Sequence, residues 1–142
     1  MGKLTKANPT ARELVTEVLD EALWWSTLNV VVQFLHAKNV EQVHVEFGFV
    51  LDRELQGKPE GQTQIVQLSD LESFIKRGLD EGTIERVGMS DFLFHPLGAE
   101  VAFMLCNDSD LHFASADSSL LLELGHEISS SGIKVYDSGH LI

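Results

Sequence analysis

Two apolar segments in the second half of the chain constrain its fold more than any other feature. "EVAFMLC" (residues 100–106) and "LHFAS" (residues 111–115) are separated by four polar residues, Asn107–Asp110. A four-residue loop there predicts a hairpin in which Cys106 lies opposite Leu111. Both faces would then be apolar, so we expect a central hairpin covered on two sides. One face would hold Met104, Cys106, Leu111 and Phe113, and the other Phe103, Leu105, His112 and Ala114.

The N-terminal part of the chain shows helical periodicity. Apolar side chains recur at spacings of three and four residues through Leu14, Val15, Val18 and Leu19. This spacing predicts an amphipathic helix that begins near Thr10.

From residue 22 to 35 the same segment becomes apolar on nearly all sides. One helix over residues 10–38 would be about 43 Å long, whereas a domain of this size has a radius of gyration of about 14 Å. Either residues 29–36 form a strand, or the helix continues and a partner subunit covers its surplus apolar area. We favour the helix, with a homodimer interface formed by Trp24, Trp25, Leu28 and Val32.

The remaining segments predict further strands and two more helices. Residues 43–51 alternate apolar and polar side chains, which is typical of a half-buried strand. Residues 52–62 contain two glycines and a proline and predict an exposed loop. Residues 69–82 predict a helix that ends at Gly82. We expect shorter strands at 63–68, 83–87, 91–94 and within 133–142, and a last helix over 118–131.

Together these elements predict one α+β domain over residues 1–142, with a largely antiparallel sheet and three helices. The long N-terminal helix would pack on the sheet or lie at a dimer interface. Residues 1–9 precede the first element, and we expect them to form a flexible N-terminus. The length of 142 residues is that of a single domain.

The formal net charge of −12 is unevenly distributed along the chain. Residues 1–40 sum to zero, residues 41–100 carry five basic and twelve acidic side chains, and residues 101–142 carry one and six. Such a surface repels phosphate, so we expect neither nucleic acid nor an anionic membrane as a partner. A basic protein is a compatible partner, and reversing the charges of Asp80 and Glu81 would test it.

Several sequence features indicate where in the cell the protein is located. Cys106 is the only cysteine, so no intramolecular disulfide is expected. The N-terminal residues lack an apolar core of signal-peptide length. The densest apolar run has 14 residues, and spanning a bilayer takes about 20. We therefore expect a cytoplasmic protein without a membrane span.

The polar residues after Cys106 are the best metal-site candidate in the sequence. Asp108, Asp110 and His112 alternate and could project to one side, where carboxylates and an imidazole suit zinc, manganese or iron. The competing interpretation is a turn, because short polar side chains hydrogen-bond turn backbones and tolerate positive φ. Asp117 would then cap the following helix. We favour the turn, and predict no bound metal or other cofactor.

Other combinations of reactive side chains are weaker candidates for a metal or catalytic site. His44 and Glu46 share one strand face about 6.7 Å apart, but that face is the polar, solvent-facing side. A pairing of Cys106 with His112 is disfavoured because the expected register puts them on opposite faces. The sequence contains no nucleophile elbow, P-loop, dinucleotide-binding glycine motif or H-E-x-x-H.

These observations favour a small acidic binding or interaction module without catalytic activity, which forms a homodimer and regulates or neutralises a protein partner. One alternative is a small metal-dependent enzyme that uses Asp108, Asp110 and His112. A second alternative is a small-ligand sensor with an aromatic pocket beneath Trp24 and Trp25.

Overall fold

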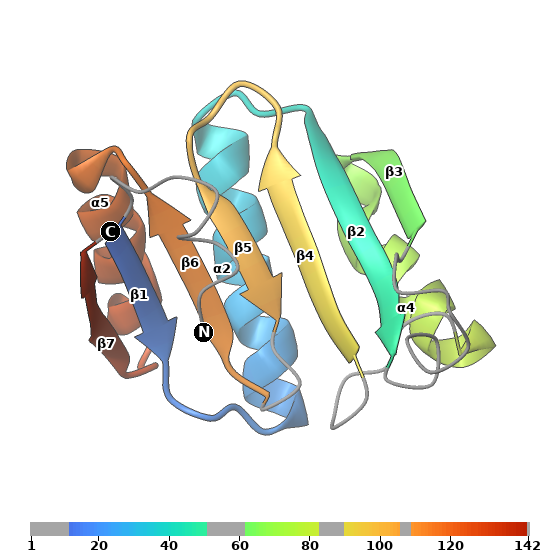
Figure 1. Cartoon of the computed structure of the whole chain (residues 1–142), viewed down its shortest axis with the longest axis horizontal. Coiled ribbons are helices and arrows are strands. Elements are labelled where there is room, and N and C mark those ends of the chain that lie inside the picture. The colour runs from blue at the N-terminus through green and yellow to red at the C-terminus, as the bar shows by residue number, and fades with distance from the viewer. Residues whose placement is uncertain (1–11, 51–61, 83–89, 106–108, 142) are drawn as a thin grey trace.

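The computed structural model describes residues 12–50, 62–82, 90–105 and 109–141. These residues form an α+β fold in which one seven-stranded antiparallel sheet is covered by three α-helices on one face (Figure 1). The strands are β1 (Arg12–Thr16), β2 (Gln42–Val50), β3 (Gln62–Gln67), β4 (Ser90–Pro96), β5 (Ala102–Leu105), β6 (Leu111–Ser115) and β7 (Val135–Leu141). The helices are α2 (Glu21–Ala37), α4 (Leu71–Glu81), α5 (Ser118–Ser130) and the short 3-10 helix η1 (Leu68–Asp70).

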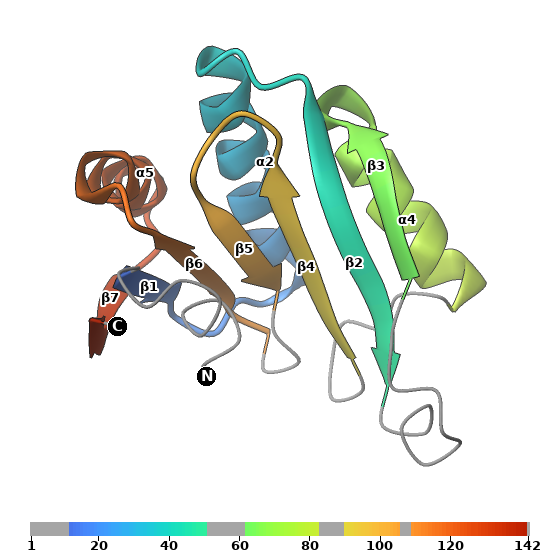
Figure 2. The ribbon, with the colours of Figure 1, turned by 45° about the horizontal axis from the view of Figure 1, so that its top comes forward.

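The strand order is β3-β2-β4-β5-β6-β1-β7, so the predicted hairpin of β5 and β6 lies in the middle of the sheet. The sheet is strongly twisted, and α2 runs behind its centre while α4 and α5 flank it (Figure 2). The prediction of a central hairpin is confirmed. All five residues of β6 are buried, and Met104 on the face away from the helices is 0% exposed.

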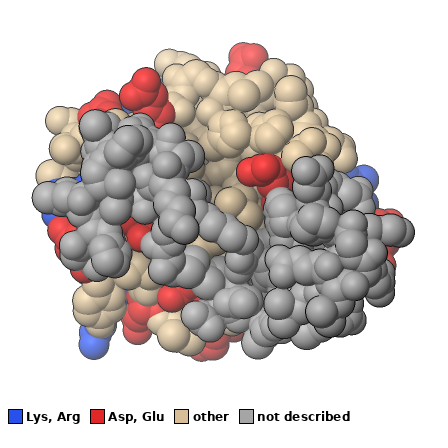
Figure 3. All heavy atoms as spheres, viewed as in Figure 1, with Lys and Arg blue, Asp and Glu red and all other residues tan. Residues whose placement is uncertain are grey.

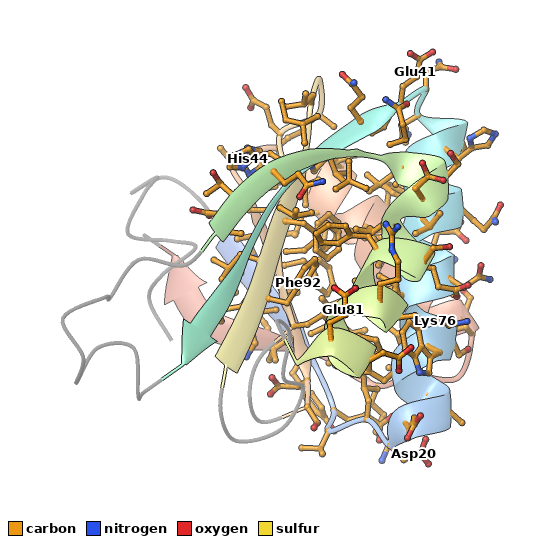
Figure 4. All side chains as sticks on the ribbon, turned by 90° about the vertical axis from the view of Figure 1, so that its right-hand side faces the viewer. Asp20, Glu41, His44, Lys76, Glu81 and Phe92 are labelled. Carbon is orange, nitrogen blue, oxygen red and sulfur yellow. The ribbon has the colours of Figure 1, made fainter. Side chains whose placement is uncertain are left out.

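Aromatic side chains on β4, β5 and β6 form the floor on which the helices pack. Phe94 and Phe103 are stacked, with ring centroids 4.7 Å apart and planes 11° apart. Phe92 extends the row toward α4, where it approaches Phe74 (Figure 4). Aromatic rings bury large apolar areas, so this row is the main source of hydrophobic stabilisation under the helical layer.

The prediction of a long N-terminal helix is wrong. Residues 12–16 form strand β1, which pairs with β6 on one side and β7 on the other, and helix α2 has only 17 residues. Asp20 ends the connection by capping α2, because its side chain accepts a hydrogen bond from the Leu23 amide at 2.8 Å. The residues whose spacing predicts a helix also alternate between the two faces of a strand. Leu14 and Thr16 face the helices, and sheet pairing overrides the weaker local preference.

Residues 29–36 are helical, as favoured, and α2 at 1.5 Å per residue is about 25 Å long, which the sheet accommodates. The predicted helix over 69–82 is confirmed as η1 followed by α4, and Gly82 ends it with φ of 79°. The final helix is capped by Asp117, whose carboxylate accepts from the Leu120 amide at 3.1 Å. The structure therefore confirms the local helix-ending and helix-starting signals at these positions.

The predicted register of the central hairpin is wrong by one residue. Leu105 pairs with Leu111, and Met104 pairs with His112. A one-residue shift exchanges the faces of one strand, so Phe103 and Leu105 point to the helices together with Phe113. Met104 and His112 lie on the opposite face. The sequence-based register assumed a four-residue loop, whereas the connection spans residues 106–110.

Some expectations concern residues outside the described ranges. These are the flexible N-terminus over 1–9, the exposed loop over 52–61 and the strand over 83–87. Gln62, which we placed in the loop, is the first residue of β3. Within the described ranges, no helix has the length and apolar character needed to cross a membrane.

Candidate functional site: the exposed face of helix α2

The exposed side of α2 is uncharged over most of its length. Residues 22–35 contain no Asp, Glu, Lys, Arg or His. The neighbouring helices differ, since α4 exposes Lys76 and Asp80 and α5 exposes Glu123 and Glu127. On the opposite face of the molecule, carboxylates stand out among the described side chains (Figure 3). The exposed residues in the uncharged part of α2 are Ala22, Leu23, Ser26, Asn29 and Gln33.

The inner side of α2 fixes the position of this exposed face. Trp24 and Leu28 are 2% exposed, and Val31 and Leu35 are fully buried against the sheet. The Thr27 hydroxyl, also buried, donates to the carbonyl of Leu23 at 2.7 Å, so its polarity is satisfied within the helix. The helix is thus held along its whole length, and its outer residues keep a fixed orientation.

The four predicted interface residues separate into two groups. Trp24 and Leu28 belong to the core of the chain itself. Trp25 and Val32 are half-buried at the edge of that core. Of these four side chains, only those of Trp25 and Val32 retain surface for a partner, so the rest of any contact must come from exposed residues such as Asn29 and Gln33.

Trp25 links α2 to α4. Its ring meets that of Trp24 edge-on, with centroids 4.6 Å apart, and the Lys76 ammonium lies 5.2 Å from the centroid of the Trp25 ring. Figure 4 shows Lys76 on α4 beside α2. A cation–π contact at this distance contributes about 0.5–1 kcal/mol at an exposed site, and it holds the indole in place.

A groove of about 350 Å³ lies between α2 and the η1–α4 segment. Its apolar lining comes from Leu28, Val32 and Leu68, and polar groups surround them. The polar lining residues are Asn29, Gln33, His36, Ser69 and Glu72. An apolar base with several polar groups around it is typical of a binding site.

A second groove, about 630 Å³ in volume, lies between α2 and α5. Asn29 and Gln33 line this groove as well as the first. Its far side includes Glu123, which forms an ion pair with Lys38 at 2.9 Å. The outer residues of α2 therefore form a ridge between two grooves. We call Leu23, Ser26, Asn29 and Gln33, together with the half-buried Trp25 and Val32, the α2 ridge.

The candidate metal residues lie on the other face of the sheet. His112 is 6% exposed, and its Nε2 lies 3.0 Å from Asp110 Oδ1. Its Nδ1 lies 3.1 Å from Oε2 of Glu13, which is 1% exposed. Asp108 is outside the described residues. The sequence did not suggest Glu13 as a neighbour of His112, because Glu13 lies in the segment from Thr10 onward that we predicted to be a helix.

The contacts of His112 differ in kind. The pair with Glu13 has hydrogen-bond geometry, whereas Asp110 Oδ1 lies close to the ring without a well-aligned hydrogen bond. The two ring nitrogens point in opposite directions, so the two carboxylates do not converge on one point. Among the described residues, no three His, Cys, Asp or Glu side chains are placed to hold a metal ion. Because Asp108 lies outside the described residues, neither the favoured turn nor the alternative metal site at Asp108, Asp110 and His112 is tested.

His44 and Glu46 remain on one face of β2, as expected, but β4 brings His95 directly opposite His44. The two imidazole centroids are 4.8 Å apart. Burial lowers the pKa of His95, the neighbouring His44 lowers it further, and Glu46 opposes both effects. His95 is still exposed to solvent, so burial removes only part of its hydration.

Titration of His95 should report these neighbours. We expect an NMR titration midpoint below the ordinary value of 6.5. His44→Gln should raise the midpoint of His95, and Glu46→Gln should lower this midpoint further. Because the unfolded chain binds this proton more readily, the contribution of His95 to stability is complete above pH 6.5 and is lost as the pH falls through the folded-state pKa. A midpoint above 6.5 would contradict the arrangement.

Comparison of the chain with protein-family models, with curated proteins and with solved structures finds no match. The geometry described above is therefore the basis on which a function can be inferred.

Proposed function

We propose that the protein is a binding module that forms a homodimer through the α2 ridge. The observation that carries this proposal is the absence of charge from residues 22–35 in a chain with a net charge of −12. The centres of protein interfaces are depleted of charged residues. Solvent-exposed helix faces of acidic proteins, by contrast, usually carry charge, as α4 does here at Asp80 and Glu81.

Electrostatics favours this face for contact between two copies. Two chains of charge −12 repel each other, but at physiological ionic strength the repulsion is screened beyond about 8 Å. Only the charges close to the contact then oppose association. On the α2 ridge, the amides of Asn29 and Gln33 can donate and accept hydrogen bonds, so two identical ridges related by a two-fold axis can satisfy each other.

The oligomeric state in solution tests the proposal. Size-exclusion chromatography with light scattering should give twice the chain mass of 15.8 kDa. Asn29→Glu combined with Gln33→Glu should yield monomer, because like charges facing each other across an interface cost several kcal/mol, which weakens association about 100-fold or more. Trp25→Glu should do the same, or produce aggregate through its neighbour Trp24.

Ser129→Glu on α5 is the matched control for Trp25→Glu, since it also adds one negative charge at a helical position, here an exposed one away from the ridge. It should remain dimeric. A monomeric wild-type chain at concentrations of tens of micromolar, or dissociation by Ser129→Glu as readily as by the ridge variants, would refute the α2 interface.

A small-ligand sensor is a second candidate, supported by the groove of about 350 Å³ beside α2. Pockets for small molecules measure about 300–1,000 Å³. Trp25 precedes Leu28 by one helical turn, so a ligand in the groove should change tryptophan fluorescence. Screening metabolites by this signal, with Val32→Glu as the variant that should abolish the response, tests the idea. A flat response across the set counts against it.

A further inference from the structure

The face of the sheet away from the helices carries a pair of histidines that are distant in the sequence. His44 on β2 and His95 on β4 are direct cross-strand partners. Their ring centroids are 4.8 Å apart and the ring planes are inclined by 42°. Figure 4 shows His44 on the side of the sheet away from α4. Side chains that face each other directly across an antiparallel pair can bind one ion between them.

The Nδ1 atom of His44 is buried. Among the described residues, it has no hydrogen-bond partner. A buried polar atom left in this state costs about 1–3 kcal/mol, so its persistence calls for an explanation, and an absent ligand is one such explanation. The His95 imidazole lies directly across from His44, which places two nitrogen ligands side by side.

The surroundings favour neutral imidazoles and an added positive charge. Two charged imidazoles this close would repel each other, and the lowered pKa of His95 is consistent with the neutral, metal-binding form at pH 7. Glu46 lies two residues along β2 on the same face, and its charge acts on His95. The cross-strand neighbour of His44 on β3 is Ile65, which brings no competing cation.

We propose that His44 and His95 form a two-imidazole binding site for a divalent transition metal such as Zn²⁺, Ni²⁺ or Cu²⁺. Imidazole nitrogen prefers these ions, whereas Mg²⁺ and Ca²⁺ require oxygen ligands. Glu46 lies outside the coordination sphere and contributes its negative charge. This assignment agrees with the absence of a three-ligand cluster from the described residues, because water fills the remaining positions.

Calorimetric titration of the full chain, without a histidine tag, with ZnCl₂ or NiCl₂ at pH 7.5 tests the site. We expect one ion per chain. His44→Gln and His95→Gln should each abolish this binding, and Glu46→Gln should weaken it about tenfold, as is typical for a group outside the coordination sphere. Binding should weaken as the pH falls below 6.5, because protons compete for the imidazoles.

His126→Gln, at an exposed position on α5, is the control and should bind normally. Circular dichroism should show that each variant is folded. Cu²⁺ electron paramagnetic resonance should detect two nitrogen ligands in the wild type, and this two-nitrogen signal should be absent from His95→Gln. The proposal is overturned if the wild type binds no ion at submillimolar concentration. It is also overturned if His112→Gln abolishes binding while His44→Gln does not, which would place the ion at the Asp110–His112 cluster.

Discussion

Phe103→Ala is expected to lower the free energy of unfolding by about 3–5 kcal/mol, the usual cost of removing a buried phenylalanine. Phe103 is 0% exposed on the central strand β5. Its ring lies between Phe94, with centroids 4.7 Å apart, and Phe113, with centroids 6.4 Å apart. The alanine would leave a cavity beneath the helical layer that rigid strands on both sides cannot close. Urea denaturation followed by circular dichroism measures the change.

The matched comparison is Leu122→Ala, which removes an apolar side chain that is 52% exposed on α5. That change should stay within about 0.5 kcal/mol of the wild type. If Phe103→Ala costs less than about 1 kcal/mol, or no more than Leu122→Ala, the aromatic row is not the centre of the core. If the chain forms the proposed dimer, its unfolding would include dissociation, so the ridge variant that is expected to be monomeric is the better background.

The elements that the sequence predicts well are those whose signal is local. Gly82 and Asp117 act within one helical turn, so the end of α4 and the start of α5 can be predicted from the local sequence. The segment that became β1 has two valid local descriptions, since its apolar residues fit both a helix and an alternating strand. Pairing with β6 and β7, which are distant in the sequence, decides between them.

The candidate sites follow the same rule. The lack of charge in residues 22–35 is visible in the sequence, and the structure adds that α2 exposes Asn29 and Gln33 between two grooves. The pairing of His44 with His95, by contrast, depends on the register of β2 against β4. Contacts of this kind require a topology, and no spacing within the chain indicates them.

The contact between Glu13 and His112 arises in the same way and leads to the second large expected effect. Replacing His112 with leucine should destabilise the chain by about 1–3 kcal/mol, the usual cost when one partner of a buried hydrogen bond is removed. Glu13 is 1% exposed and its Oε2 is 3.1 Å from His112 Nδ1. The variant would leave that carboxylate facing an apolar side chain. Denaturant unfolding at pH 7 provides the measurement.

A double-mutant cycle with Glu13→Leu separates the pair from its surroundings. Removing both partners also removes the buried carboxylate that loses its His112 contact in the single variant, so the double variant should be more stable than the sum of the single changes predicts, by about 0.5–3 kcal/mol. Strictly additive effects would show that the two side chains act independently. Asp110 offers a graded comparison: its side chain is 17% exposed, against 2% for Glu13, although its Oδ1 atom is buried. Asp110→Asn should therefore cost less than any change at Glu13, because the less buried side chain keeps more of its contact with water.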